Sequence, residues 1–344
     1  MIRTIGIVSL SRGLLGEPFM AHEERLGLAR LEKLGVQVRF LPHARMGLSY
    51  LAAHPEARAE DLIRAFEDPE IDMILCAIGG DDTYRLAPYL FDGGRLQKAV
   101  RKKIFLGFSD TTMNHFMLHK VGLPTFYGQA FLPDVCELES EMLLYSRGYF
   151  ETLVRTGTIR RVTPSGVWYE ERTHFGEDQL GVPRKRHPNT GFALLQGAPR
   201  FCGQILGGCI DSIYDMFSPA RYADMPSVCR EYGLFPSAEE WKGKILLLES
   251  SEEQMEPEKY REALEMLKNA GVFAAVSGVL VGKPMDEKYH AEYQRLLREV
   301  IGDPELPVVC NLSIGHALPR CILPFGVDAV VDTEKQEIIF GNRA

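Results

Sequence analysis

The 344-residue sequence contains no run of about 20 apolar residues, so no segment is expected to cross a bilayer as a helix. The first residues run directly into an apolar stretch without a long apolar core or a small-residue cleavage site, so we expect no signal peptide. Excess positive charge is also lacking, because the formal net charge is −8. This charge argues against a broad surface for nucleic acid or for an anionic membrane.

Paired cysteines and metal motifs are lacking as well. The seven Cys are scattered, and the nearest pair, Cys202 and Cys209, matches no zinc spacing. An odd number of dispersed Cys predicts reduced, buried thiols and a cytoplasmic location. His115 and His119 lie one helical turn apart, but Phe116 stands where zincins have Glu, and a third ligand is not evident. We therefore expect neither a metal site nor a cofactor.

The residues that are present predict an α/β protein of two domains. In the first half, apolar strands alternate with amphipathic helices, which predicts a parallel sheet covered by helices on both faces. The predicted strands cover residues 2–10, 36–41, 71–78 and 104–108, and the predicted helices cover 19–34, 59–66, 84–90 and 134–155. In such sheets, functional sites lie beyond the carboxyl ends of the strands.

The second half predicts mixed β and α structure with fewer crossover helices. Residues 203–208 (GQILGG) are interpreted as a Gly-rich turn, and the stretch from about 157 to 200 as a linker with a loop over the site. The remaining predicted strands cover residues 244–248, 276–281, 308–312, 324–332 and 337–340, and the helices cover 260–270 and 289–300. The predicted domains are 1–160, a linker and substrate loop at 161–200, and 201–344.

Ser109 stands at the most informative position in the chain. It follows the apolar strand 104–108, and a helical pattern begins directly after it, so we expect it on a sharp strand-to-helix turn. This geometry exposes a hydroxyl next to the backbone N–H of Asp110, as a nucleophile requires. The alternative is that Ser109 only caps the helix.

Two further polar residues follow apolar strands in the second half. Glu249 closes the run 245–248 (ILLL), where an unpaired carboxylate would be costly, and His316 follows Gly315 after the strand 308–312. A nucleophilic serine needs a base, and the base needs an acid that fixes its tautomer, so Ser109, His316 and Glu249 supply one of each. The alternatives are a buried His bonded to backbone, and a Glu that caps a helix or forms a surface salt bridge.

Two other features are weaker indications of a ligand. Trp168 lies in the central loop, where it either packs on the neighbouring domain or stacks on a ligand. The pair Gly207 and Gly208 could cradle a phosphate, but the P-loop Lys-Ser/Thr and a Gly-x-Gly-x-x-Gly pattern are both missing. A nucleotide-dependent ligase is therefore a poor interpretation.

Six short motifs occur in one order along most of the chain and resemble the LD-carboxypeptidase family of serine peptidases. They are residues 79–83 (GGDDT), 107–112 (GFSDTT), 127–128 (YG), 203–208 (GQILGG), 248–249 (LE) and 315–316 (GH). The family includes muramoyl-tetrapeptide LD-carboxypeptidases and microcin C self-immunity proteins. The resemblance implies a flavodoxin-like N-terminal domain, a C-terminal swivelling β/β/α domain, and a homodimer.

The resemblance also implies roles for particular residues. Ser109 matches the nucleophile, His316 the base and Glu249 the orienting acid, and the backbone N–H groups of Gly80 and Asp110 match the oxyanion hole. We expect the substrate to contact Asp81, Trp168 and Gly208, with Trp168 stacking on a nucleoside as an aromatic residue of the central loop does in the microcin-immunity branch.

The predicted function is hydrolysis of a C-terminal amide or peptide bond by a serine enzyme. The sequence has Ile78 where the peptidoglycan branch often has Arg, and residues 168–171 (WYEE) and 278–284 (GVLVGKP) look more like the microcin-immunity branch. We therefore expect peptidyl or aminoacyl nucleotides as substrates. Cleavage of an L,D peptide bond in muropeptides, or binding of a small ligand without catalysis, are the alternatives.

Overall fold

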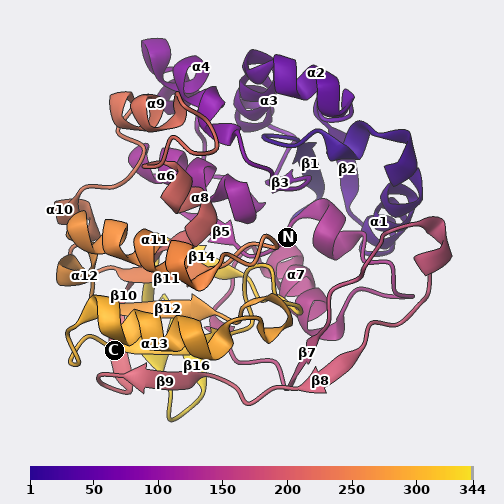
Figure 1. Ribbon diagram of the computed structural model, residues 1–344. Helices are drawn as coiled ribbons and strands as arrows, with labels where there is room; N and C mark the ends of the chain where they lie inside the picture. The colour runs from indigo at the N-terminus through magenta and orange to yellow at the C-terminus, as the bar shows by residue number, and fades with distance from the viewer. Residues whose placement is uncertain (342–344) are drawn as a thin grey trace.

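The computed structural model describes residues 1–341 and contains two main β-sheets, which lie in the upper and lower parts of Figure 1. The first sheet has the order β14-β5-β4-β3-β1-β2, and the order β2-β1-β3-β4-β5 within it is that of flavodoxin-like folds. Its strands are β1 (Thr4–Val8), β2 (Gln37–Phe40), β3 (Met73–Cys76), β4 (Ile104–Gly107), β5 (Thr125–Tyr127) and β14 (Leu323–Phe325). The first five are parallel, and β14 is antiparallel to β5.

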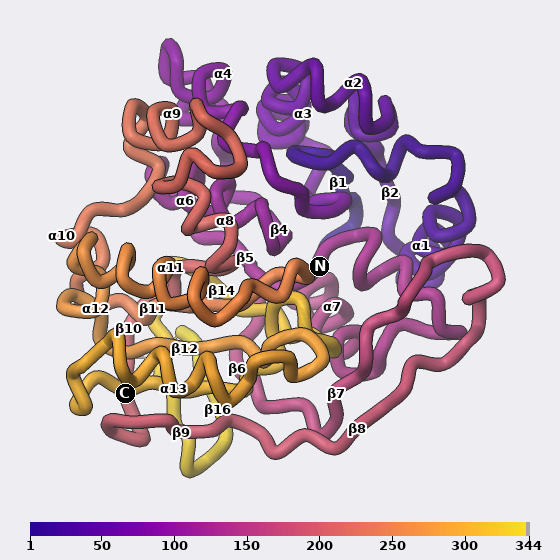
Figure 2. Tube along the Cα trace, viewed as in Figure 1, coloured from indigo at the N-terminus to yellow at the C-terminus, as the bar shows by residue number. Residues whose placement is uncertain are grey.

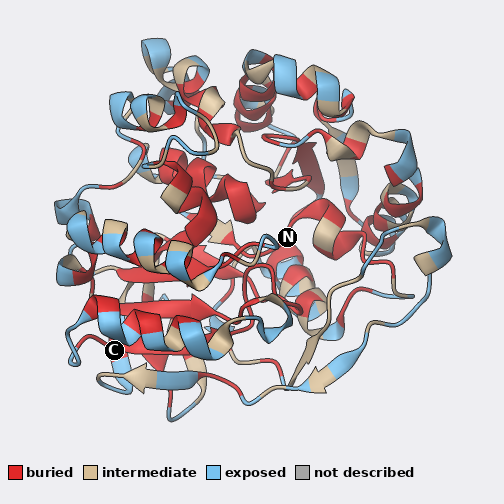
Figure 3. Cartoon of the chain, in the orientation of Figure 1, coloured by how far each residue is buried: buried red, intermediate tan, exposed pale blue. Residues whose placement is uncertain are grey.

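Helices cover this first sheet, and its central strands are therefore buried along their whole length. The helices are α1 (Ala21–Lys33), α2 (Gly47–Ala53), α3 (Pro55–Glu67), α4 (Ala87–Phe91), α5 (Arg95–Ala99), α6 (Thr112–Lys120) and α7 (Leu144–Thr156). The predicted strand and helix alternation is confirmed, and α2 and α5 are additional short helices. The buried strands and helix faces form the core in Figure 3.

The second sheet has eight strands in the order β6-β16-β15-β10-β11-β12-β13-β9. Its strands are β6 (Arg161–Val162), β9 (Ala193–Gln196), β10 (Arg200–Cys209), β11 (Ile245–Glu249), β12 (Gly278–Gly282), β13 (Val308–Leu312), β15 (Asp328–Asp332) and β16 (Glu337–Phe340). Strands β10 to β13 are parallel, whereas the outer strands are antiparallel. The separate C-terminal sheet domain was therefore predicted correctly.

The helices of the second half connect the parallel strands. They are α8 (Ile210–Asp215), α9 (Met225–Glu231), α10 (Ala238–Trp241), α11 (Pro257–Asn269), α12 (Val272–Ala275) and α13 (His290–Ile301). Helices α11 and α13 pack side by side, with the rings of Tyr260 and Tyr293 stacked 3.9 Å apart (Figure 1). None of the helices within residues 1–341 combines the length and apolar composition needed to cross a bilayer.

The central segment is more structured than predicted. Figure 2 shows it running along the lower right edge, where β7 (Val167–Tyr169) and β8 (Arg186–Pro188) form a small hairpin. Strands β6 and β9 from the same segment form the two edges of the second sheet, and β14 from the C-terminal half joins the first sheet. The chain therefore passes between the two sheets more than once, and the domain boundaries at 160 and 200 stay predictions.

The Gly-rich turn predicted at residues 203–208 is wrong, because these residues lie within the ten-residue strand β10. A Cβ atom on Gly207 would lie 2.1 Å from the Leu247 carbonyl oxygen, and one on Gly208 would lie 2.4 Å from Thr112 Oγ1. The glycines therefore allow β10 to approach β11 and α6 closely. A close backbone approach within a strand gives the same sequence signal as a turn.

Two other predicted elements are divided. The helix predicted at 134–155 is divided into the end of a π-helix (Phe131–Val135) and α7 from Leu144. Between them, the Arg30 guanidinium donates hydrogen bonds to the carbonyls of Val135, Glu137 and Glu139. These bonds satisfy the carbonyls outside a helix. The strand predicted at 324–332 is β14 and β15, which belong to different sheets and are separated by Gly326 at φ 73°.

Candidate active site

Ser109 lies on the turn between β4 and α6, as the sequence predicted. Its φ is 66°, a left-handed conformation that is uncommon for a residue with a side chain. Thr112 Oγ donates a hydrogen bond to the Ser109 carbonyl at 2.7 Å, which fixes the turn from the first residue of α6. The Ser109 side chain is thus aimed away from the helix axis, and the residue retains 9% exposure.

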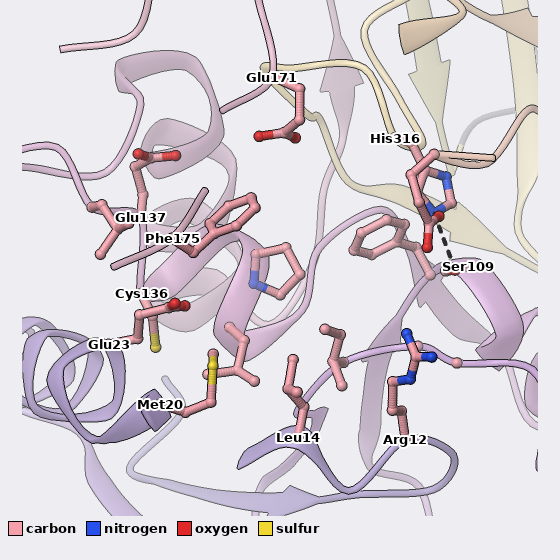
Figure 4. Close-up of a pocket in the computed structure, with 18 of the residues that line it drawn as sticks. Arg12, Leu14, Met20, Glu23, Ser109, Cys136, Glu137, Glu171, Phe175 and His316 are labelled. Atoms are coloured by element: carbon pink, nitrogen blue, oxygen red, sulfur yellow. Dashed lines mark hydrogen bonds and ion pairs between the residues drawn. The ribbon is translucent and has the colours of Figure 1, made fainter. Parts of the chain in front are cut away.

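The second half supplies a His and a Glu that meet this serine. Glu249 is the last residue of β11, and His316 lies in the loop after β13. His316 Nε2 is 3.1 Å from Ser109 Oγ, and His316 Nδ1 is 2.7 Å from Glu249 Oε2 (Figure 4 shows the contact between Ser109 and His316). The structure therefore brings together three residues that are widely separated in sequence, in the arrangement expected of nucleophile, base and orienting acid.

Tyr127 contacts both Glu249 and Ser109, the two ends of this chain of hydrogen bonds. Its hydroxyl donates to Glu249 Oε1 at 2.6 Å and accepts the backbone N–H of Ser109 at 3.1 Å. Tyr127 is fully buried at the end of β5, so both contacts are shielded from water. The sequence singled out the pair Tyr127–Gly128 without assigning this bridging role.

A second carboxylate contacts the same imidazole. Glu252 Oε2 lies 3.0 Å from His316 Nε2, the nitrogen that also faces Ser109. Burial alone would lower the pKa of His316, but the carboxylates of Glu249 and Glu252 outweigh it and raise the pKa to about 10. The hydrogen bond to His316 lowers the pKa of Glu252 to about 2. The two carboxylates therefore favour the imidazolium form of His316. Sequence reasoning missed Glu252 because it resembles an ordinary surface Glu.

Gly80 and Asp110 lie beside the serine hydroxyl. A Cβ atom on Gly79 would be 2.7 Å from Ser109 Oγ and 3.2 Å from the Asp110 backbone nitrogen, so the backbone at 79–80 faces the turn. Gly80 has φ 151°, where a Cβ atom would lie 2.3 Å from Ser11 Oγ. Among the described residues no acceptor is found for the N–H of Gly80 or Asp110, so both can donate to a bound oxygen.

A cavity of about 630 Å³ opens at Ser109 and His316 (Figure 4). Its far wall is largely apolar and includes Leu14, Met20, Leu132, Pro133, Leu138 and Phe175. Arg184, Arg221 and Arg320 also line the cavity, and each of them is bound to a carboxylate. The Arg12 guanidinium, by contrast, has no ion pair among residues 1–341, which leaves one cation available to an anionic group.

The three residues predicted to contact substrate lie in different surroundings. Asp81 lines the cavity and lies 3.4 Å from Arg221. Gly208 is within β10 against Thr112 and is not among the residues that line the cavity. Trp168 is also not among them, because its ring stacks on His187 at 4.3 Å within the hairpin of β7 and β8.

The central segment reaches the cavity further along the chain. Glu171, Phe175, Gly176 and Arg184 line it, and the Phe175 side chain, at 48% exposure, faces the space shown in Figure 4. The predicted loop over the site is thus present, but its cavity-lining aromatic is Phe175. Trp168 was predicted because the resemblance implies a stacking aromatic on the central loop, whereas the fold of that loop decides which ring faces the cavity.

Histidine and cysteine side chains are the candidates for metal binding in this chain. His115 is fully buried, and its Nδ1 forms a hydrogen bond with Thr125 Oγ at 2.7 Å. Burial lowers the pKa of His115 to about 3, so it is a structural residue. Cys209, Glu249 and His316 offer ligand atoms within 4.8 Å of one another. However, Glu249 and His316 are hydrogen-bonded together, and burial raises the pKa of the Cys209 thiol well above its usual range, which opposes the thiolate form.

Comparisons with known proteins show the family of the chain. Residues 5–128 match the LD-carboxypeptidase N-terminal domain, and residues 202–331 match the LD-carboxypeptidase C-terminal domain. The chain belongs to the LD-carboxypeptidase family. The family is one of serine peptidases, so the protein is a hydrolase of this class.

Relatives come from both branches of the family. A crystal structure of an MccF-like protein from Streptococcus pneumoniae in complex with AMP is 58% identical, with full coverage of both chains and a TM-score of 0.98. The microcin C7 self-immunity protein MccF of Escherichia coli is 25% identical over 294 residues, covering 84% of this chain and 79% of MccF. Its structure with aspartyl sulfamoyl adenosine has the same fold, at a TM-score of 0.79, 23% identity and coverage of 99% and 96%. A probable murein peptide carboxypeptidase of Bacillus subtilis is 26% identical, covering 90% of this chain and 84% of that protein.

Proposed function

We propose that this chain hydrolyses the amide bond of aminoacyl or peptidyl nucleotides through a Ser109–His316–Glu249 triad. The observation that carries the proposal is the row of hydrogen bonds from Glu249 through His316 to Ser109, which ends at a cavity of about 630 Å³. A serine on a strained turn with an imidazole at hydrogen-bond distance is the arrangement that nucleophilic catalysis requires.

The proposed reaction begins with attack of Ser109 Oγ on the amide carbonyl carbon, while His316 Nε2 takes the hydroxyl proton. The carbonyl oxygen becomes an oxyanion that accepts hydrogen bonds from the N–H groups of Gly80 and Asp110. His316 then returns the proton to the leaving amine, and water attacks the acyl-enzyme with the same base. Because Glu252 favours the imidazolium form of His316, Nε2 must first lose its proton to solvent, and Glu252 must leave Nε2, before the ring can act as the base.

Three features support a nucleotide as the leaving half of the substrate. The cavity has an apolar wall, Phe175 offers an exposed ring for base stacking, and Arg12 is a cation without an ion pair among the described residues. The MccF-like protein at 58% identity is in complex with AMP, and MccF is in complex with aspartyl sulfamoyl adenosine. Phe175 therefore replaces Trp168 as our candidate for stacking on the base.

Mass-spectrometric product analysis tests this proposal. Purified protein is offered aspartyl sulfamoyl adenosine and, separately, a muramoyl tetrapeptide. We expect aspartate and sulfamoyl adenosine from the first, and Ser109→Ala should lower this turnover by several orders of magnitude with an unchanged melting temperature. Retained turnover in Ser109→Ala would exclude the covalent mechanism.

The second candidate function is the cleavage of an L,D peptide bond in a muropeptide, which is favoured by the likeness to the murein peptide carboxypeptidase of Bacillus subtilis. Release of D-Ala from the tetrapeptide, with no cleavage of the nucleotide, would assign this function instead. A non-catalytic binding protein would give neither product, and its Ser109 would not react with a fluorophosphonate probe. A homodimer in the cytoplasm remains part of the proposal, and light scattering tests the dimer.

A further inference from the structure

A second, much smaller pocket of about 30 Å³ adjoins Ser109 on the side of Gly80 and Asp110. Ser109, Gly80 and Arg221 line both this pocket and the large cavity, so the two spaces meet at the nucleophile. If the nucleotide half of a substrate occupies the large cavity, the acyl half must lie toward the small pocket. The chemistry of the small pocket therefore bears on the acyl group of the proposed substrate.

Carboxylates dominate the lining of this pocket. They are Asp81, Asp110, Asp211, Asp215, Glu252 and Glu253, and Arg221 is the one guanidinium or ammonium group among the lining residues. Arg221 binds Asp81 at 3.4 Å, Asp215 at 2.8 Å and Glu253 at 2.5 Å. Glu252 is paired with His316. Neither Asp110 nor Asp211 forms an ion pair among the described residues, although the charge of His316 acts on Asp211.

Each of these two carboxylates also has one oxygen without a hydrogen-bond partner. Asp211 is 6% exposed; its Oδ2 accepts the Ser251 N–H at 2.9 Å, but its Oδ1 has no donor among the described residues. Asp110 is fully buried; its Oδ2 accepts from Ser11 and Thr83, but its Oδ1 has no donor either. Buried oxygens are almost always hydrogen-bonded, so the pocket lacks a donor.

Size and charge limit what that donor can be. A space of about 30 Å³ holds a group the size of one water molecule, which excludes a guanidinium or a carboxylate side chain. A primary ammonium has this size, carries the opposite charge and has three N–H donors and no acceptor. Burial raises the pKa of Asp110 to about 7 and also raises that of Asp211, and a bound cation would favour the charged form of both.

We propose that the small pocket binds a primary ammonium group of the acyl half of the substrate, with Asp211 accepting one of its hydrogen bonds. The inference rests on the proposed function and extends it to the acyl group. The ammonium can be the α-amino group of an aminoacyl unit or the end of a lysine-like side chain. In both cases an acyl group with a positive charge is selected over one in which the nitrogen is acetylated.

The test measures binding, so that it does not depend on turnover. Ser109→Ala is titrated by calorimetry with sulfamoyl adenosine carrying alanyl, N-acetyl-alanyl or N-acetyl-lysyl groups. We expect the alanyl or the N-acetyl-lysyl ligand to bind at least tenfold more tightly than N-acetyl-alanyl, and the ligand that does so identifies the source of the ammonium. Adding Asp211→Asn should abolish this preference. Glu262→Gln removes the same charge from α11 outside the pocket and should keep the preference.

Several outcomes would overturn the inference. The inference is wrong if the three ligands bind with equal affinity, if none of them binds, or if the preference survives Asp211→Asn. Each result would mean that the pocket holds a water molecule only. Hydrolysis of the same ligands by the wild-type protein is measured in parallel. Ammonium-selective binding without hydrolysis would keep the pocket and refute the proposed function, whereas hydrolysis without selectivity would do the reverse.

Discussion

At the scale of single residues, the site places one imidazole between two carboxylates. Glu249 holds His316 Nδ1, and Glu252 competes with Ser109 for Nε2. An imidazolium cannot take a proton from the serine, so the same contacts that orient the ring also keep it from acting as a base. Activity is therefore expected to rise with pH as His316 loses its proton.

Glu252→Gln tests this competition. The substitution removes one of the charges that raise the pKa of His316, so the acid limb of kcat/KM should move to lower pH by about one unit or more. Activity near neutral pH should rise with it. The measurement is a pH profile of kcat/KM, which reports groups of the free enzyme.

Glu256→Gln is the matched control for this profile, because the Glu256 side chain is exposed and, among the described residues, hydrogen-bonds only with the Tyr289 hydroxyl. Its acid limb should coincide with that of the wild-type protein. An unchanged acid limb in Glu252→Gln would show that Glu252 does not govern the protonation of His316.

At the scale of elements, the site depends on how closely β10 approaches α6 and β5. Gly208 has φ 138°, and a Cβ atom there would lie 2.4 Å from Thr112 Oγ1 and 2.8 Å from Tyr127 Cε2. Thr112 holds the Ser109 turn, and Tyr127 holds Glu249. The glycine thus allows the Ser109 turn and Glu249 to approach each other, although it does not line the cavity.

Gly208→Ala should therefore reduce both stability and activity. We expect the free energy of unfolding to fall by roughly 2 kcal/mol or more, because the methyl group must push apart well-packed elements at an unfavourable φ. Urea denaturation and kcat are the measurements.

Gly148→Ala is the control: nothing lies within 4 Å of its added Cβ in helix α7, so stability should rise by up to about 1 kcal/mol. Similar effects of the two variants would contradict the assigned role of Gly208.

The elements also show what could be predicted from sequence. Strands β3 and β4 were recognisable because buried parallel strands are continuous apolar runs. Ser109, Glu249 and His316 were candidates because they follow such runs, but their roles were assigned from the resemblance to the family. Strand β10 was not, because its glycines serve contacts with distant residues. Glu252 and Phe175 were missed for a related reason: only the folded chain shows which Glu faces His316 and which ring of the central loop faces the cavity.

At the scale of the whole molecule, the C-terminal half of the chain contributes a strand to the first sheet. β14 comes from the C-terminal half but pairs with β5 of the first sheet, through Leu323 and Tyr127, which are both fully buried. Helix α9 adds another connection, since the Tyr84 hydroxyl donates to Asp224 just before that helix. Neither half therefore buries all of its core alone.

This shared construction predicts cooperative unfolding. Calorimetry of the full chain should give one transition with equal calorimetric and van't Hoff enthalpies. A fragment of residues 1–160 lacks β14 and leaves the apolar edge of β5 open, so it should not give a folded monomer. Two separate transitions, or a monomeric fragment with native near-ultraviolet circular dichroism, would contradict this prediction.

The return of β14 to the first sheet has a consequence for biosynthesis. Residues 323–325 are translated long after Ser109, although β14 pairs with β5 beside the Ser109 turn. Until these residues are made, the first sheet of a nascent chain lacks one edge strand. Under the proposed function, a product that ends before His316 would have no hydrolytic activity.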